Sequence, residues 1–334
     1  MQTVLITGAT GFFGRHLVEY AVEHGINVIA SVRSTSAVNW LEKLNIPVVF
    51  LSLSKPEKLI IELNDITEAH GHIDVVIHNA GVTQSLKASE YYKVNFGLTK
   101  NLVIALTSLS SKLPKFIFTS SIAALGPGDP ITFKPINEDD SPNPITHYGK
   151  SKLLAEQFLM NQDELPWVIV RPTIIYGSRE KNFLKMIQSV NRGMEIYVGS
   201  KKQMLSFIYV ADLADIFFRL IEGNFSKKVY NVSDGGAYSA IHANQIIKSI
   251  LNKKTISVVV PKCVVRLIAS FNEIIGRARC IAPILNSNKI NEMEQLNWLC
   301  DNSKIVSELG FSPSIKLKEG IKRTTNWYKE NDWL

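Results

Sequence analysis

Residues 3–25 read TVLITGATGFFGRHLVEYAVEHG, with three glycines that stand three apart at Gly8, Gly11 and Gly14. The run before the glycines, Val4 to Thr7, is aliphatic and β-branched and predicts a buried strand. The segment after them, Arg15 to Glu23, has apolar residues at helical spacing, and Gly25 follows where a helix ends. The stretch therefore predicts a strand, a glycine-rich turn and a helix in that order.

A strand, a glycine turn and a helix together predict a phosphate-binding loop. The N-terminus of a helix presents unpaired N–H groups and the positive end of the helix dipole. Glycine allows a tight turn and lets the backbone approach a pyrophosphate with no Cβ in the way. A plain turn between any strand and helix is the alternative, but the order of the elements favours a dinucleotide.

The composition is that of a soluble globular protein, with 334 residues of which 46% are hydrophobic and 20% charged. We see no secretory signal and no apolar run of the ~20 residues that span a membrane. The cysteines are odd in number and far apart (Cys263, Cys280 and Cys300), which favours reduced thiols and a cytoplasmic location. The net charge of +7 is scattered along the chain, so we expect an anionic small molecule rather than nucleic acid as the partner.

Short apolar runs alternate with helical patterns through the first two thirds of the chain. Seven strands are predicted: residues 4–7, 27–33, 47–53, 74–80, 115–122, 167–172 and 228–232. Helical patterns lie between most of them, at residues 15–23, 40–44, 54–63, 89–109 and 148–161. Such alternation predicts an α/β fold with a doubly wound parallel sheet. Ligands of these sheets lie outside the carboxyl ends of the strands, where we look for function.

The end of the second strand bears on the choice of cofactor. It carries Arg33, and no Asp or Glu lies between Asn27 and Asn39. An acidic residue there binds the ribose 2′-hydroxyl of NAD, whereas an arginine pairs with the 2′-phosphate of NADP. We therefore expect NADP, with NAD as the alternative; a solvated arginine at a strand end is the plainer interpretation.

A tyrosine and a lysine stand four residues apart in HYGKSKLLAEQFL, from His147, as Tyr148 and Lys152. On a helix that begins at the tyrosine they share one face. A tyrosine of pKa near 10 is a poor base, but an ammonium close by and an oxidised nicotinamide favour the phenolate. The pair would then exchange a proton with a secondary alcohol or a ketone. Ser121, at the end of the fifth strand, would hold the same oxygen.

These motifs together carry a resemblance to a known family. TGATGFFG (7–14), the serine that ends the fifth strand, YGKSK (148–152) and RPTIIYG (171–177) resemble the extended short-chain dehydrogenase/reductases, the NAD(P)-dependent epimerase/dehydratase group. The resemblance runs from residue 1 to about residue 235. It implies a Rossmann-type fold with a smaller C-terminal substrate lobe, and Ser121, Tyr148 and Lys152 as catalytic residues.

The resemblance also implies a set of cofactor-binding residues. The phosphate loop would be Thr7, Gly8, Gly11, Phe12, Phe13 and Gly14. Ser52 and Leu53 stand where the family often has an Asp-Leu pair near adenine, so that contact would be altered. Further cofactor contacts would come from Asn79, Ala80, Arg33, Tyr148, Lys152, Pro172 and Ile175. Asn95 matches a structural asparagine that bridges backbone. We find no His/Asp/Glu cluster at ligand spacing and expect no metal.

Two lobes are expected, a cofactor domain of residues 1–172 and 204–234 and a substrate lobe of residues 173–203 and 235–334. Nucleotide-sugar members of the family place an arginine two residues after the glutamine that Gln203 matches, and it clamps the substrate diphosphate. Leu205 stands there instead, and a leucine forms no charge-assisted hydrogen bond. Arg179, Lys201 and Lys202 are alternative phosphate contacts.

Residues 263–275, CVVRLIASFNEII, are apolar at helical spacing. We expect a lobe helix that buries this face; a helix on a membrane surface or over an apolar substrate is the alternative.

Three functions compete. We expect an NADP-dependent oxidoreductase acting on a ketone or secondary alcohol; an NAD-dependent nucleotide-sugar epimerase or dehydratase is the alternative. A non-enzymatic dinucleotide sensor is the third, but it would not need a serine, a tyrosine and a lysine for proton transfer. In the family, helices such as residues 89–109 and 148–161 pair across a two-fold axis, which implies a homodimer.

Overall fold

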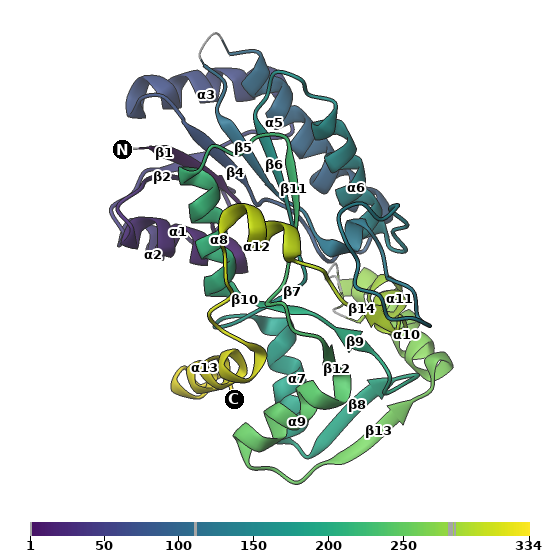
Figure 1. Cartoon of the computed structure of the whole chain (residues 1–334). Helices are drawn as coiled ribbons and strands as arrows, with labels where there is room; N and C mark the ends of the chain where they lie inside the picture. Colours follow the sequence, from purple (N-terminus) through teal and green to yellow (C-terminus); the bar gives the residue numbers. More distant parts are fainter. Residues whose placement is uncertain (1, 110–111, 280–282, 284) are drawn as a thin grey trace.

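The computed structural model describes residues 2–109, 112–279, 283 and 285–334, and its centre is a seven-stranded parallel sheet (Figure 1). The order across the sheet is β11-β6-β5-β4-β1-β2-β3. The strands are β1 (Thr3–Thr7), β2 (Asn27–Val32), β3 (Val48–Phe50), β4 (Val75–His78), β5 (Lys115–Thr119), β6 (Trp167–Pro172) and β11 (Lys228–Val232). All seven predicted strands are confirmed, and the order reverses between β1 and β4, which is the switch point of a doubly wound sheet.

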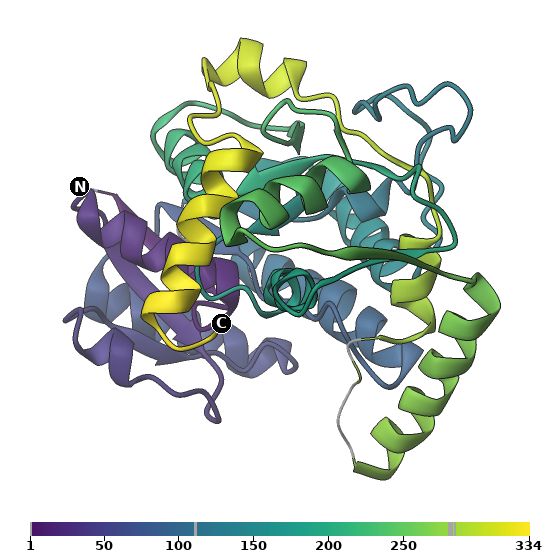
Figure 2. The ribbon, with the colours of Figure 1, turned by 90° about the horizontal axis from the view of Figure 1, so that it is seen from below.

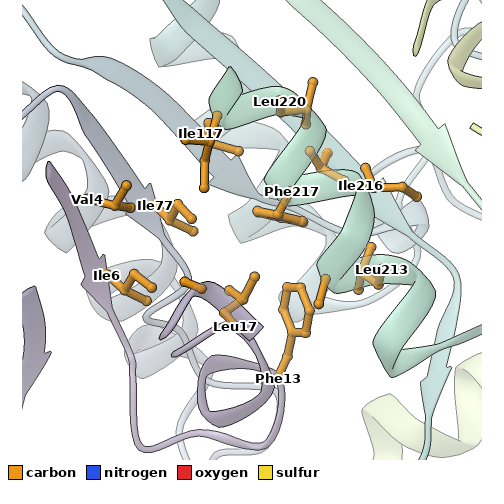
Figure 3. Packing of buried hydrophobic residues seen from close by; sticks show 14 of the residues in the cluster. Val4, Ile6, Phe13, Leu17, Ile77, Ile117, Leu213, Ile216, Phe217 and Leu220 are labelled. Carbon is orange, nitrogen blue, oxygen red and sulfur yellow. The ribbon is translucent and has the colours of Figure 1, made fainter. Parts of the chain in front are cut away.

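Helices cover both faces of the sheet because successive strand residues point to opposite sides. Val4 and Ile6 pack into one core with α1 (Phe12–Glu23) and α8 (Val210–Glu222), as Figure 3 shows for Phe13, Leu17 and Phe217. Leu5, between them, packs into a second core under α3 (Pro56–His70), α5 (Leu98–Thr107) and α6 (His147–Met160). The sheet is therefore buried on both faces, which explains its nearly continuous apolar strands.

The helix expected over residues 89–109 is interrupted. It consists of α4 (Ala88–Tyr91), a π-helical turn at Tyr92–Gly97 and α5. Asn95 lies on this turn and is fully buried. Single π-helical turns inside longer helices occur frequently at functional sites, and apolar periodicity does not reveal them.

A second body of smaller elements lies below the sheet in Figure 1. Within the described residues it holds three small sheets, β10–β7, β12–β9–β14 and β13–β8. Their strands are β7 (Ile174–Tyr176), β8 (Met194–Val198), β9 (Met204–Leu205), β10 (Phe207–Tyr209), β12 (Tyr238–Ser239), β13 (Ile256–Val260) and β14 (Asn297–Trp298). The helices are α7 (Lys181–Asn191), α9 (Ala240–Leu251), α10 (Lys262–Arg279), α11 (Ser287–Met293) and α13 (Leu317–Glu330).

Two short helices belong with the large sheet. These are α2 (Asn39–Glu42) and α12 (Ser303–Leu309), which contribute Leu41 and Ile305 to the core around α1 and α8. The chain thus returns from the small sheets to the large one before it ends in α13.

The apolar face expected to be buried in α10 is exposed. Its large apolar residues from Val264 to Ile275 are more than 40% accessible, whereas Val265 and Ala269 are buried. The prediction that this helix buries its apolar stripe is therefore wrong. Within the described residues, no helix is both long and apolar enough to cross a membrane.

Candidate active site

The glycine turn joins β1 directly to α1, and its three glycines have different structural roles. Gly8 has a φ of +69°, and a Cβ there would lie 2.8 Å from the backbone of Ala80. A Cβ at Gly14 would lie 2.0 Å from the Gly8 carbonyl oxygen, so the first turn of α1 approaches β1 only without a side chain. Gly11 is the N-cap of α1 and makes no side-chain capping bond. The first N–H groups of α1 are thus available to an anion, as a pyrophosphate requires.

The cleft at the carboxyl end of the sheet has a volume of about 950 Å³. Nine of the predicted site residues line it: Gly11, Phe12, Phe13, Asn79, Ser121, Tyr148, Lys152, Pro172 and Ile175. Seven others do not line it: Thr7, Gly8, Gly14, Arg33, Ser52, Leu53 and Ala80. Residues at or just after the ends of β4, β5 and β6 therefore meet the N-terminus of α1 in one hollow.

Thr7 supports the cleft from beneath. Its hydroxyl accepts a hydrogen bond from the backbone N–H of Ala80 at 3.2 Å and contacts Nδ1 of His78 at 2.8 Å. Thr99 donates its hydroxyl hydrogen to the Asn95 carbonyl, so we assign Nε2 of His78 as donor to Thr99 and Nδ1 as acceptor from Thr7. Burial lowers the pKa of His78 to about 3. This neutral histidine ties the ends of β1 and β4 together.

Ser52 and Leu53 are fixed by hydrogen bonds to side chains of neighbouring helices. The backbone N and Oγ of Ser52 donate to the Glu62 carboxylate at 2.6 and 2.7 Å. The Leu53 carbonyl accepts from Asn101 at 2.9 Å. Glu62 thus brings a carboxylate to the strand end where the serine replaces the family's aspartate.

Arg33 is exposed at the end of β2. The turn that follows it is held against the glycine loop, because Thr10 donates to Ser36 Oγ at 3.3 Å and Ser36 N donates to the Arg33 carbonyl at 2.9 Å. The arginine therefore stands beside the phosphate loop rather than in the cleft wall.

Tyr148 is brought to the cleft by the first turn of α6. Thr146 caps the helix by accepting from the Gly149 N–H at 3.1 Å. A Cβ at Gly149 would lie only 2.2 Å from the Ala123 carbonyl oxygen. The missing side chain lets the helix approach the short 3₁₀ turn that Ser121 begins after β5, so that Ser121 and Tyr148 are neighbours.

Lys152 lies one turn further along α6 and is almost completely buried. Its Nζ donates to the Thr119 carbonyl at 2.8 Å and lies 4.7 Å from the centre of the Phe118 ring. Burial lowers the pKa of Lys152 to about 8, and the Glu156 carboxylate acts in the opposite direction. Glu156 itself is fully buried and pairs with Arg171 at 2.6 Å, so the acidic member of a buried ion pair lies on the same helix as the lysine.

The pKa of Tyr148 is shifted in the direction opposite to the one that its spacing from Lys152 predicts. Burial raises it to about 12, Glu292 on α11 adds to the rise, and a hydrogen bond with Ser121 opposes it. A tyrosine with this pKa needs further positive charge nearby before it serves as a base near neutral pH.

Asn95 confirms the expected bridging role. Its Oδ1 accepts from Val82 N at 2.8 Å, and its Nδ2 donates to the Val82 carbonyl at 3.0 Å and to Ser151 Oγ at 2.9 Å. It joins the loop after β4 to α6, on which Tyr148 and Lys152 lie.

The far wall of the cleft was missed by the sequence prediction, apart from Arg179. It comprises Glu180, Lys181, Asn182, Trp327, Asn331 and Trp333, with Gly81 to Thr83 at the β4 edge. Arg179 is paired with Glu19 at 2.8 Å and lies 5.7 Å from the Trp327 ring. No motif marks these residues, because the segment after β7 and the C-terminal residues meet only in the folded chain.

The described residues contain no group of three or more His, Cys, Asp or Glu side chains that could hold a metal ion. Of the cysteines, Cys263 is exposed and Cys300 is buried, both with free thiols, and Cys280 lies outside the described residues.

Comparisons with known proteins agree with this architecture. Residues 4–233 match the family described as NAD dependent epimerase/dehydratase. A sterol-4-alpha-carboxylate 3-dehydrogenase (decarboxylating) of Dictyostelium discoideum is 24% identical over 96% of this chain and 99% of the relative. A UDP-glucose 4-epimerase of Vibrio cholerae is 27% identical over 97% of this chain and 94% of the relative.

Solved structures show the same fold. The UDP-glucose 4-epimerase of Thermotoga maritima, solved with UDP-glucose, superposes with a TM-score of 0.78 at 21% identity over 99% of each chain. The dTDP-glucose 4,6-dehydratase of Bacillus anthracis, solved with NAD, gives 0.77 at 16% identity over 99% of this chain and 98% of the other. The chain thus belongs to the NAD-dependent epimerase/dehydratase family of extended short-chain dehydrogenase/reductases and is an NAD(P)-dependent oxidoreductase or epimerase with a Rossmann-type fold.

Proposed function

We propose that this enzyme is an NADP-dependent reductase or dehydrogenase that acts on a weakly charged ketone or secondary alcohol. The observation that carries the proposal is the meeting of Ser121, Tyr148 and Lys152 with the uncapped N-terminus of α1 in one cleft of about 950 Å³. A volume of this order is typical of cofactor and small-molecule sites.

In this proposal Tyr148 donates its phenolic proton to the substrate oxygen during reduction and removes it during oxidation. Ser121, its neighbour, donates a hydrogen bond to the same oxygen. Lys152 would hold the hydroxyls of the nicotinamide ribose and would carry the positive charge that a phenolate needs. When bound, the nicotinamide cofactor supplies or accepts the hydride, and its oxidised ring adds a second positive charge.

The remaining predicted cofactor residues form three groups. Gly8, Gly11, Phe12, Phe13 and Gly14 would hold the pyrophosphate over β1 and α1. Asn79, Pro172 and Ile175 would lie along the nicotinamide and would contact its carboxamide. Ser52, Leu53 and Ala80 would shape the adenine side, with Thr7 fixing the backbone beneath.

The preference for NADP rests on Arg33. The turn after this residue is tied to the glycine loop through Thr10 and Ser36, which supports a role for this exposed arginine in binding a ribose 2′-phosphate. We expect Arg33→Asp to weaken NADPH binding by about tenfold or more, the loss of one charge-assisted pair, and to leave NADH binding unchanged or stronger. Equal loss for both nucleotides would argue against this role.

The preference for a weakly charged substrate rests on the region around Leu205. Gln203, which the nucleotide-sugar frame retains, donates to the carbonyls of Met293 and Gln295 at 3.2 and 2.9 Å. Asp212 accepts from Ser314 Oγ and Ile315 N at 2.6 and 2.9 Å. Both side chains are thus used in hydrogen bonds within the protein, so their presence does not favour a sugar-nucleotide substrate.

A nucleotide-sugar epimerase or dehydratase, using NAD that is reduced and reoxidised within a turnover, is the second candidate. Several relatives carry such names, and Lys181 and Arg179 line the cleft. A diphosphate would have to compete with Glu19 for Arg179, which pairs with it at 2.8 Å.

One experiment separates the two candidates. The protein is purified without added nucleotide and denatured, and the released compounds are identified by mass spectrometry; the stripped protein is then titrated with NADPH and NADH. An empty site that prefers NADPH supports the proposal, and stoichiometric NAD retained through purification supports the epimerase or dehydratase. Tyr148→Phe is the control, because loss of the phenolic hydroxyl should abolish turnover while the ring that remains keeps most of the nucleotide affinity.

We also propose that the chain is divided into two lobes and forms a homodimer. Residues 1–172 and 204–234 would bind the cofactor, and 173–203 and 235–334 the substrate, except that β9 and β10 lie in the small sheets and α12 packs on the large one. Exposed Ile104 on α5 and Leu154 on α6 would lie in the dimer interface, so Leu154→Asp should yield monomers in sedimentation velocity. A cytoplasmic location is expected from the cysteine content.

A further inference from the structure

The helix α10 presents opposite faces to different surroundings. Val265 and Ala269 are buried against Ile290 and the ends of β8 and β13. The opposite face carries six exposed large apolar residues, which we call the outer stripe: Val264, Leu267, Ile268, Phe271, Ile274 and Ile275. Figure 2 shows the helix standing out at the edge of the molecule. Such a stripe is unusual on a free surface.

The spacing of the outer stripe makes it one continuous surface. Its members recur at intervals of three and four residues from Val264 to Ile275, so at about 100° per residue they occupy roughly a third of the helix circumference. Leu267 and Phe271, at its centre, are 71% and 69% exposed. The stripe therefore faces away from the protein along the length of the helix.

The apolar surface continues onto the sheet beside the helix. In the parallel pair β8–β13, Met194 is in register with Ile256 and Ile196 with Val258, and all four are exposed. They share a sheet face with Val198 and Val260, because side chains two residues apart point the same way. Val198 and Val260 pack against the inner face of α10, so the exposed sheet face adjoins the helix.

The segment that carries this apolar surface is rich in positive charge. Residues 253–279 contain six Lys and Arg against one Glu, an excess of five in a chain whose net charge is +7. Lys253, Lys254, Lys262 and Arg279 are exposed, whereas Arg266 pairs with Glu294 at 2.6 Å. A second copy of the helix would bring like charges together, whereas an anionic surface would attract them.

We propose that α10 and the adjoining β8–β13 face dock this protein onto a membrane surface that contains anionic lipids. The outer stripe enters the boundary between headgroups and acyl chains, and the flanking lysines and arginines contact the headgroups. The helix lies along the surface, in keeping with the finding that no described helix is suited to cross a membrane.

The test is co-sedimentation of the purified full chain with vesicles of phosphatidylcholine, alone or mixed with phosphatidylglycerol. We expect binding to the mixed vesicles that weakens with added salt. Leu267→Gln combined with Phe271→Gln should lower the partition coefficient by about tenfold or more, since two large side chains no longer leave water. The matched control is Ile61→Gln combined with Ile131→Gln, because these residues are 61% and 85% exposed elsewhere on the surface.

A second variant tests the role of the positive charges separately. Lys254→Gln combined with Lys262→Gln should reduce binding to mixed vesicles and leave nucleotide affinity unchanged, which also reports correct folding. Wild-type protein that stays in the supernatant with mixed vesicles would overturn the proposal. So would stripe and control variants that bind equally well. Sedimentation velocity tests the alternative that a second copy of this chain covers the outer stripe. A wild-type dimer without lipid that becomes a monomer in the stripe variant, together with no vesicle binding, would support that alternative and overturn the proposal.

Discussion

Gly14 and Gly11 offer a matched pair of alanine substitutions in the phosphate loop. An added Cβ at Gly14 would lie 2.0 Å from the Gly8 carbonyl oxygen, whereas one at Gly11 would lie 3.2 Å from that same oxygen. Ordinary contact between carbon and oxygen begins at about 3.3 Å. Gly14→Ala therefore requires the backbone of β1 and α1 to separate by more than about 1 Å, and Gly11→Ala requires a shift of about a tenth of that.

The two free energies of unfolding should differ accordingly. Alanine in a helix gains about 0.5–1 kcal/mol over glycine, but overpacking against a fixed backbone costs about 1–3 kcal/mol or more. We expect Gly14→Ala to lower the stability of the free protein by about 1–2 kcal/mol. Gly11 has a φ of −71°, which alanine adopts freely, so Gly11→Ala should change stability by less than about 0.5 kcal/mol.

Nucleotide binding gives the second readout. Gly11 lines the cleft at the N-terminus of α1, where a methyl group would stand against the pyrophosphate. Both variants should therefore lose about tenfold or more in NADPH affinity, which is about 1.4 kcal/mol, and only Gly14→Ala should also lose stability. Urea denaturation and isothermal titration measure the two quantities. A Gly14→Ala protein as stable as wild type would refute the steric argument, and a Gly11→Ala protein with unchanged affinity would refute the placement of the pyrophosphate.

Three further predictions concern buried titratable side chains. Glu156→Gln leaves the Arg171 guanidinium buried without its partner and should cost about 3–5 kcal/mol of stability in urea denaturation; Glu156→Gln combined with Arg171→Met should recover most of it, and no recovery would contradict the argument. The folded-state pKa of Lys152 is lowered from 10.5 to about 8, so between these values the unfolded chain binds the extra proton. Stability should therefore rise with pH in that window by up to about 1.4 kcal/mol per unit, and Lys152→Met should remove this rise; equal slopes would argue against it. The pKa of His78 is lowered from 6.5 to about 3, so the free energy of unfolding should fall as the pH drops from 6.5 to about 3. His78→Gln should reduce this loss of stability in acid, and an unchanged loss would show that other groups cause it.

The large sheet was predictable because its signals are local. Each strand is a short apolar run bounded by turn residues, and burial on both faces makes such runs nearly continuous. The break in the predicted helix of residues 89–109 was not predictable from periodicity, because the π-helical turn at Tyr92–Gly97 shifts the pattern by a single residue. The prediction that α10 buries its apolar face was wrong for a related reason. Apolar spacing shows that a helix has an apolar face, but only the surrounding chain determines what covers that face.

In the candidate site, too, local features were predictable from the sequence and long-range features were not. Spacing within one helix was enough to place Tyr148 and Lys152 on α6, and strand ends were enough to place Ser121 beside them. The pKa of Tyr148 depends instead on burial and on Glu292, which is 144 positions away in the sequence. Local motifs therefore identify which groups meet, whereas their protonation depends on distant parts of the chain. It follows that a change at Glu292, which no motif marks, should lower the pKa of Tyr148, and a pH profile of Glu292→Gln shifted to lower pH would show this directly.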